Sequence, residues 1–194
     1  MKGVVSTQFG LMVPHGKLQP CIGFLEDGLR ALNTTPYHRV LGRNFLGQAD
    51  DLAAWLIEFH EESSAAKLRL AAVYLEMNGF TINPDQWHCN LFGYKQAGNI
   101  WELDWLSRWD AERQECFVLR GMEPVQEAFA ELFLEQGKPL GIQLAEEVAE
   151  HLVTARFMEL VAAAHAVAKD RYAGLRGLPV LATAHDWDMV HQTE

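Results

Sequence analysis

Residues 87–94, WHCNLFGY, decide the predicted fold because side chains of different character alternate along them. A period of two residues is typical of a β-strand, whose successive side chains point to opposite faces of a sheet. One face would carry Trp87, Cys89 and Leu91. The other face would carry His88, Asn90, Phe92 and Tyr94. The stretch therefore predicts a strand that buries its first face against a hydrophobic core.

Two further short strands are predicted after this one. Residues 95–99, KQAGN, contain a glycine and are typical of a hairpin loop. Residues 100–105 alternate again, with apolar side chains at Trp101, Leu103 and Trp105 and acidic ones at Glu102 and Asp104. A strand here would turn its indoles to the core and its carboxylates to water. A turn or short helix over 106–114 would carry Trp109, and residues 115–121 would complete an antiparallel meander.

Apolar side chains at helical spacing predict five helices around the meander. The first lies within residues 23–32, the second begins at Asp50 or Asp51, and the third runs from Ser63 or Ser64 to Met77. The fourth begins near Pro124, and the fifth covers residues 142–172. The second and third of these would form a helical hairpin. Residues 179–183, PVLAT, would give the last strand, and residues 4–9, VVSTQF, a short strand near the N-terminus.

These elements predict an α+β fold: a small antiparallel sheet of three to five strands with helices packed on one face, and more helix than strand. A chain of 194 residues can bury a sufficient core without disulfides. We expect a single domain over residues 1–194, in which a less regular portion, 1–49, packs on 50–194.

The charge balance excludes several kinds of partner. The net charge is −10, and a negative surface opposes nucleic acid and anionic membrane faces. The charge is uneven, with +3 in residues 1–49 and −13 in residues 50–194. The N-terminus lacks the apolar stretch of a signal peptide, and no run is long enough to span a bilayer, so a cytoplasmic protein is expected.

No catalytic or cofactor motif is present. The three cysteines, Cys21, Cys89 and Cys116, are widely spaced and form no C-x-x-C pair, so buried free thiols are expected. The chain has no Walker A loop, no G-x-G-x-x-G and no G-x-S-x-G. The sequence therefore points to no cofactor.

The favoured function is a non-enzymatic, acidic binding module that meets another protein, with a basic partner favoured by charge complementarity. The composition is similar to that of bacterial inhibitor or immunity-type proteins. The formation of a homodimer is a further possibility that the sequence does not decide. The predicted binding residues combine aromatic and acidic side chains near the second face of the sheet: His88, Tyr94, Glu102, Asp104 and Trp109. The alternative is an ordinary solvated outer face.

Two other functions stay open. A small hydrolase-type enzyme would use His88, Glu102 and Asp104 as acid–base groups in a cleft, where their carboxyl pKa values would have to differ. A metal site would use the C-terminal stretch AHDWDMVH, in which His185, Asp188 and His191 share a face only if the stretch is helical. A deep pocket would favour the enzyme, and a flat acidic face would favour the binding module.

Overall fold

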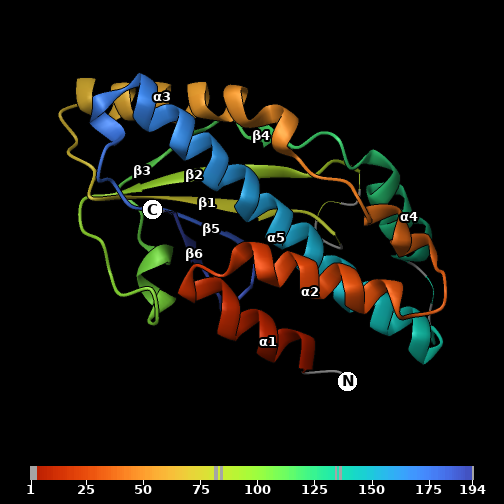
Figure 1. Cartoon of the computed structure of the whole chain (residues 1–194). Helices are drawn as coiled ribbons and strands as arrows, with labels where there is room; N and C mark the ends of the chain where they lie inside the picture. Colours follow the sequence, from red (N-terminus) through yellow and green to blue (C-terminus); the bar gives the residue numbers. More distant parts are fainter. Residues whose placement is uncertain (1–3, 81–82, 84, 134, 136, 194) are drawn as a thin grey trace.

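The computed structural model describes residues 4–80, 83, 85–133, 135 and 137–193. Helices make up 54% of the chain and strands 14%, and the helices pack against one mixed sheet. Figure 1 shows the long helix α5 (Leu140–Arg171) crossing the sheet, with α2 (Leu18–Arg30) and α3 (Ala49–Ala65) packed on either side of it. The predicted α+β class, with more helix than strand, is confirmed.

The sheet has the strand order β3-β2-β1-β5-β6, and β4 also pairs with β2. The strands are β1 (Ala72–Asn78), β2 (His88–Tyr94), β3 (Ala111–Glu112), β4 (Phe117–Val118), β5 (Val180–Ala184) and β6 (His191–Gln192). Strand β1 is antiparallel to β2 but parallel to β5, so the sheet is mixed rather than wholly antiparallel. The reason is α5, which returns the chain to the end of the sheet where β1 begins, so that β5 runs in the same direction.

Several predicted elements are confirmed. Strand β2 forms where the alternation predicted it, and its register pairs Cys89 with Met77 and Leu91 with Leu75. These four side chains are buried on the side of the sheet that faces the helices. Helices α2, α3, α5 and α4 (Glu123–Phe133) and strand β5 also lie where the apolar spacing places them.

The helix predicted from Ser63 or Ser64 to Met77 is wrong. Helix α3 continues to Ala65, and Lys67 then adopts a left-handed backbone with φ 60°, which a continuing right-handed helix does not allow. The next residues form β1, the central strand, which is hydrogen-bonded to β2 on one edge and to β5 on the other. The apolar positions of this stretch are compatible with both a helix and a strand. The extended form is adopted because its backbone is hydrogen-bonded to a neighbouring strand on each edge.

The short strand predicted over residues 4–9 is also wrong, because helix α1 (Val4–Met12) occupies this position. The helical backbone places Phe9 in the core, where its ring lies 5.1 Å from that of His151 on α5 and 5.4 Å from that of Trp187. In the N-terminal portion α1, the 3-10 helix η1 (Val13–His15) and α2 follow one another and pack against α5 or its neighbours, whereas residues 31–48 hold only the short 3-10 helices η2 (Pro36–Val40) and η3 (Leu46–Gln48).

Residues 100–105 do not form the predicted strand. They lead into a 3-10 helix, η4 (Leu103–Ser107). The outer edge of β2, where the segment was expected to pair, is taken by β3 and β4. The segment instead lies on the second face of the sheet, where Ile100, Leu103, Trp105 and Leu106 pack on Tyr74, Phe92, Tyr94 and Leu181.

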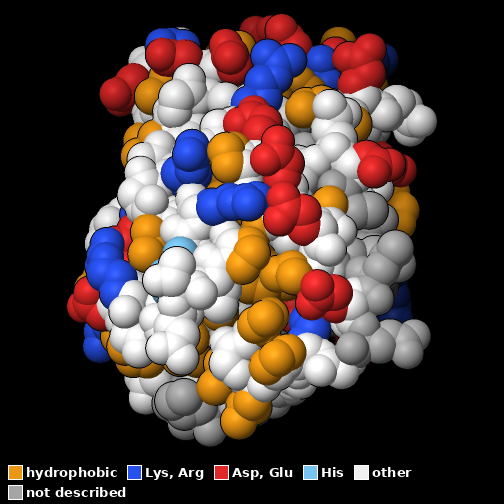
Figure 2. Space-filling model, turned by 90° about the vertical axis from the view of Figure 1, so that its right-hand side faces the viewer, with side chains coloured by type: hydrophobic (Ala, Val, Ile, Leu, Met, Phe, Trp, Pro, Cys, Tyr) orange, Lys and Arg blue, Asp and Glu red, His pale blue; other side chains and the backbone are white. Residues whose placement is uncertain are grey.

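None of the helices in the described ranges combines the length and the apolar character that crossing a bilayer requires. On the molecular face shown in Figure 2, charged side chains gather in the upper part and hydrophobic ones in the lower part.

Candidate functional site

The segment 95–110 is attached to the second face of the sheet through Trp105. The Trp105 ring lies 4.8 Å from the ring of Tyr94 in an edge-to-face arrangement, and its Nε1–H donates to Asn99 O at 3.1 Å. The Tyr94 hydroxyl donates to Leu106 O at 2.8 Å. A Cβ atom at Gly98 would lie 2.3 Å from the Trp105 ring, so only glycine allows this close approach. These contacts give the segment a defined shape.

Two tryptophans of this segment face solvent instead of the core. Trp101 is 59% exposed and Trp109 is 47% exposed. Each keeps one ring contact, Trp101 with His15 at 5.6 Å and Trp109 with Phe92 at 4.9 Å. The expectation that Trp101 turns inward is therefore wrong, because the 3-10 turn replaces the strand alternation on which it depended. Trp109 is exposed, but less so than Trp101.

The acidic side chains beside these indoles are also exposed. Glu102 and Asp104 form no side-chain hydrogen bond or ion pair with any other residue that the structure describes. Asp110 differs, because it accepts from the Lys95 backbone N–H at 2.8 Å and pairs with Lys95 Nζ at 3.0 Å, contacts that hold its pKa below the ordinary value. The two carboxylates that have no such partner can pair with cations from outside the molecule.

The structure separates His88 and Tyr94 from that surface. Tyr94 is only 1% exposed and lies beneath the segment, and its burial raises the pKa of its hydroxyl. His88 begins β2 and Tyr94 ends it, so they lie about 20 Å apart along the strand. The prediction that this strand presents an open aromatic face is therefore wrong at Tyr94, because segment 95–110 covers Tyr94.

The hydrolase constellation of His88, Glu102 and Asp104 is not assembled. His88 lies at the opposite end of β2, with its ring Nδ1 3.3 Å from Gln86 O, while the two carboxylates flank and enter η4. The prediction required all three groups in one cleft, and the fold does not bring them together.

A different titratable cluster forms on the second face of the sheet. His185 Nδ1 lies 2.8 Å from Glu76 Oε1, and the Tyr74 hydroxyl donates to Glu76 Oε2 at 3.0 Å. The hydrogen bond to Glu76 raises the pKa of His185. Sequence reasoning missed Glu76 because it placed residues 63–77 on a helix. The signal that could have found it is the alternation within AVYLEMN, residues 72–78, combined with a parallel partner in PVLAT.

The C-terminal metal site required His185, Asp188 and His191 on one face of a helix, and this helix does not form. Residues 191–192 form strand β6, and His191 is 7% exposed, whereas His185 is exposed and turned to Glu76. Within the described ranges, no three His, Cys, Asp or Glu side chains are grouped so that they could hold a metal ion.

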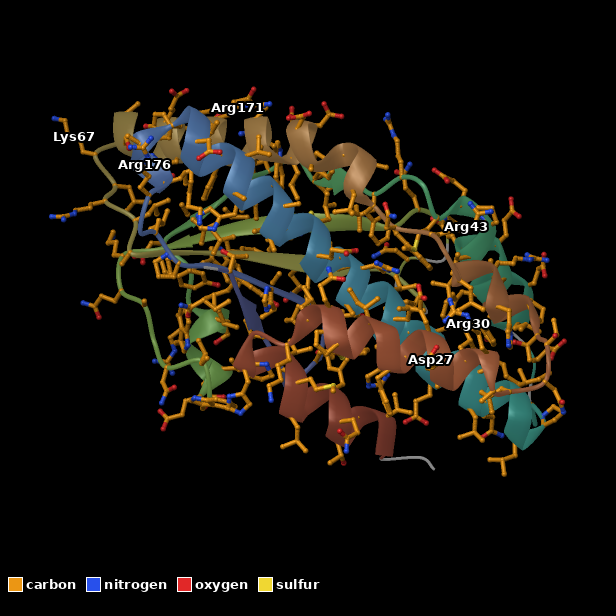
Figure 3. The ribbon with its side chains drawn as sticks, viewed as in Figure 1. Asp27, Arg30, Arg43, Lys67, Arg171 and Arg176 are labelled. Carbon is orange, nitrogen blue, oxygen red and sulfur yellow. The ribbon has the colours of Figure 1, made fainter. Side chains whose placement is uncertain are left out.

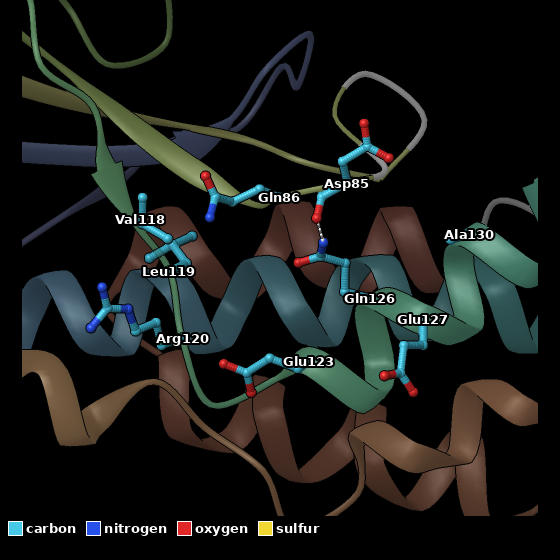
Figure 4. Close-up of a pocket in the computed structure, with 9 residues that line it drawn as sticks. All are labelled: Asp85, Gln86, Val118, Leu119, Arg120, Glu123, Gln126, Glu127 and Ala130. Carbon is cyan, nitrogen blue, oxygen red and sulfur yellow. Dashed lines mark hydrogen bonds between the residues drawn. The ribbon is translucent and has the colours of Figure 1, made fainter.

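A cavity of about 520 Å³ lies between the end of β4 and helix α4, and Figure 4 shows the side chains that line it. Its polar groups support the local structure. Gln126 donates to Asp85 O and accepts from the Trp87 N–H at 3.3 Å. The Gly121 N–H donates to the Glu123 carboxylate at 2.9 and 3.0 Å, which lowers the pKa of Glu123. Because these side chains are engaged with the backbone, this cavity is a weaker candidate than the exposed tryptophan segment.

Comparisons of the chain with protein-family models, curated proteins and solved structures found no match.

Proposed function

We propose that this protein is a binding module that recognises a basic partner protein through a tryptophan surface, defined as the side chains of Trp101, Glu102, Asp104 and Trp109. The observation that carries the proposal is the exposure of two indoles on one short segment, 59% and 47%. Tryptophan is enriched among the residues that dominate protein–protein binding energy.

The indoles can supply a large part of the affinity. A tryptophan side chain has about 150–250 Å² of surface. About half of it is exposed at each position. At about 25 cal/mol per Å², covering this half contributes about 2–3 kcal/mol per indole, before the entropy cost of association is subtracted.

Charge favours a basic partner. Glu102 and Asp104 lie next to Trp101 in the chain, and residues 50–194 carry a net −13. Complementary charges raise the association rate and suppress wrong partners. Lysine and arginine side chains can also stack on the exposed indole faces, so the same partner groups satisfy the carboxylates and the rings.

The test is affinity capture from native lysate with the purified wild type, two surface variants and two control variants. A specific partner is retained by the wild type, released by salt, and lost by Trp101→Ala/Trp109→Ala and by Glu102→Lys/Asp104→Lys. The matched controls are Leu140→Ala, which removes another exposed apolar side chain, and Glu61→Lys/Glu115→Lys, which makes the same charge change elsewhere. Both controls should retain the partner. Capture of the same proteins by all forms, or of acidic proteins only, contradicts the proposal.

A second candidate, proton-transfer chemistry of a hydrolase type, is favoured by the Glu76–His185 pair. A carboxylate that orients an imidazole is the arrangement found in general-base catalysis. Its test is separate: any hydrolytic activity of the purified protein should be abolished by His185→Gln and Glu76→Gln and be unaffected by Trp101→Ala. Activity that survives both substitutions excludes this pair.

A further inference from the structure

A cavity of about 600 Å³ lies at the end of the molecule where α3 and α5 finish and where β1 and β5 begin. We call it the basic groove, because its charged lining side chains are Lys67, Arg69 and Arg176 and no aspartate or glutamate lines it. In a chain with net charge −10, three cations around one hollow without a lining carboxylate are unexpected. Figure 3 shows Lys67 and Arg176 at the same end of the molecule and Arg43 at the opposite end.

The cations of the basic groove are not used to hold the fold together. Lys67 and Arg69 form no side-chain hydrogen bond or ion pair with any residue in the described ranges, and the Arg176 guanidinium donates only from Nε, to Lys169 O at 3.1 Å. Seven of the other basic residues are paired with carboxylates: Arg30, Arg39, Lys95, Arg113, Lys138, Arg156 and Arg171.

The ordinary structural explanation accounts for only part of this charge. Cations are favoured at helix C-termini, and α3 and α5 both end beside the groove. Each helix end carries about half a negative charge, so two helices offset about one of the three cations. The surplus is about two positive charges.

The backbone around the groove fixes its shape. Lys67 (φ 60°) and Gly177 (φ 75°) both have left-handed conformations, and the Leu68 N–H donates to Ser63 O at 2.8 Å. Lys67, Arg69 and Arg176, which lie at or beside these turns, are exposed. Leu70 and Leu178, each 8% exposed, contribute apolar surface to the lining, and His60 forms part of the wall.

We propose that the basic groove binds a small organic molecule that carries a phosphate group. A phosphate monoester carries about −1.5 to −2 charges at neutral pH, which matches the surplus positive charge. Two arginines offer forked donors for phosphate oxygens, and Lys67 adds a compact charge. The apolar lining provides contact for the organic part, and the volume is in the range of small-molecule sites. This inference does not depend on the tryptophan surface.

The experiment is a calorimetric or NMR titration with phenyl phosphate, inorganic phosphate and benzyl alcohol. Phenyl phosphate should bind most tightly, because the probe has both the charge and an apolar body, and its affinity should fall with added salt. Lys67→Gln/Arg176→Gln should weaken binding by at least about tenfold. The control Arg43→Gln/Arg120→Gln removes the same charge from two exposed positions outside the groove lining and should leave the affinity nearly unchanged.

Arg69 allows a finer comparison. Arg69→Lys keeps the positive charge but loses the forked donors, so it should weaken binding, and Arg69→Gln, which loses both, should weaken binding several-fold more. The proposal is overturned if the wild type binds no phenyl phosphate at millimolar concentration, or if the groove and control variants lose affinity equally. Equal affinity for inorganic phosphate and phenyl phosphate overturns the assignment of an organic ligand. Thermal unfolding of each variant verifies that the fold is retained.

Discussion

Replacing Trp105 with alanine should destabilise the fold, whereas the same replacement at Trp101 should not. Trp105 is partly buried against Tyr94, and its Nε1–H donates to Asn99 O. Loss of the buried part of the indole costs about 2 kcal/mol. The edge-to-face contact and the hydrogen bond each add about 0.5–1 kcal/mol. The expected loss in the free energy of unfolding is therefore about 3 kcal/mol.

Trp101 provides the control with the same chemical change. Its ring is largely exposed and keeps a single contact with His15, so Trp101→Ala should cost less than about 1 kcal/mol. Urea unfolding followed by circular dichroism measures both values. In thermal scans, Trp105→Ala should lower Tm by about 6–12 °C, given about 2–4 °C per kcal/mol for a chain of this size.

The result decides which tryptophans maintain the segment and which are available for a partner. Equal destabilisation by the two substitutions would refute the assignment of Trp101 to a binding surface. A loss below about 1 kcal/mol for Trp105→Ala would show that the contacts with Tyr94 do not hold segment 95–110 in place.

Two further predictions concern pH. The hydrogen bond to Glu76 raises the pKa of His185, so the stability it contributes is present below the unfolded pKa and is lost as pH rises through the folded pKa. In Glu76→Gln an NMR titration should give a lower pKa for His185, and an unchanged value would contradict the pairing. Burial, with a smaller contribution from nearby Glu146, raises the pKa of Glu150 to about 7 from 4.5. Stability should therefore fall as pH rises between these values, and Glu150→Gln should be more stable than the wild type by about 1–2 kcal/mol at about pH 8 and similar at about pH 4. Identical urea midpoints at the higher pH would refute the burial of this carboxyl.

The candidate sites could be predicted only in part. Trp109, which lies beyond the alternating stretch, is exposed, but Trp101 within that stretch is more exposed. Glu102 and Asp104 are exposed as predicted, but from an irregular segment and not from a strand. The basic groove was not predicted, because Lys67 and Arg176 are more than a hundred positions apart and meet only when α3 and α5 end on the same side of the sheet.

The sequence by itself determined the helices α2 to α5 and the strands β2 and β5, because each depends on a periodicity that is contained within the element. Only the tertiary structure decided that residues 72–78 are extended, since their apolar spacing suits a helix equally well and the choice depends on neighbours on both edges. The same holds for segment 100–105. Its alternation is compatible with a strand, but β3 and β4 occupy the edge where it would have paired, so its backbone turns and the Trp101 indole faces water. A strand requires a partner from elsewhere in the chain, and that requirement cannot be evaluated from the strand's own residues.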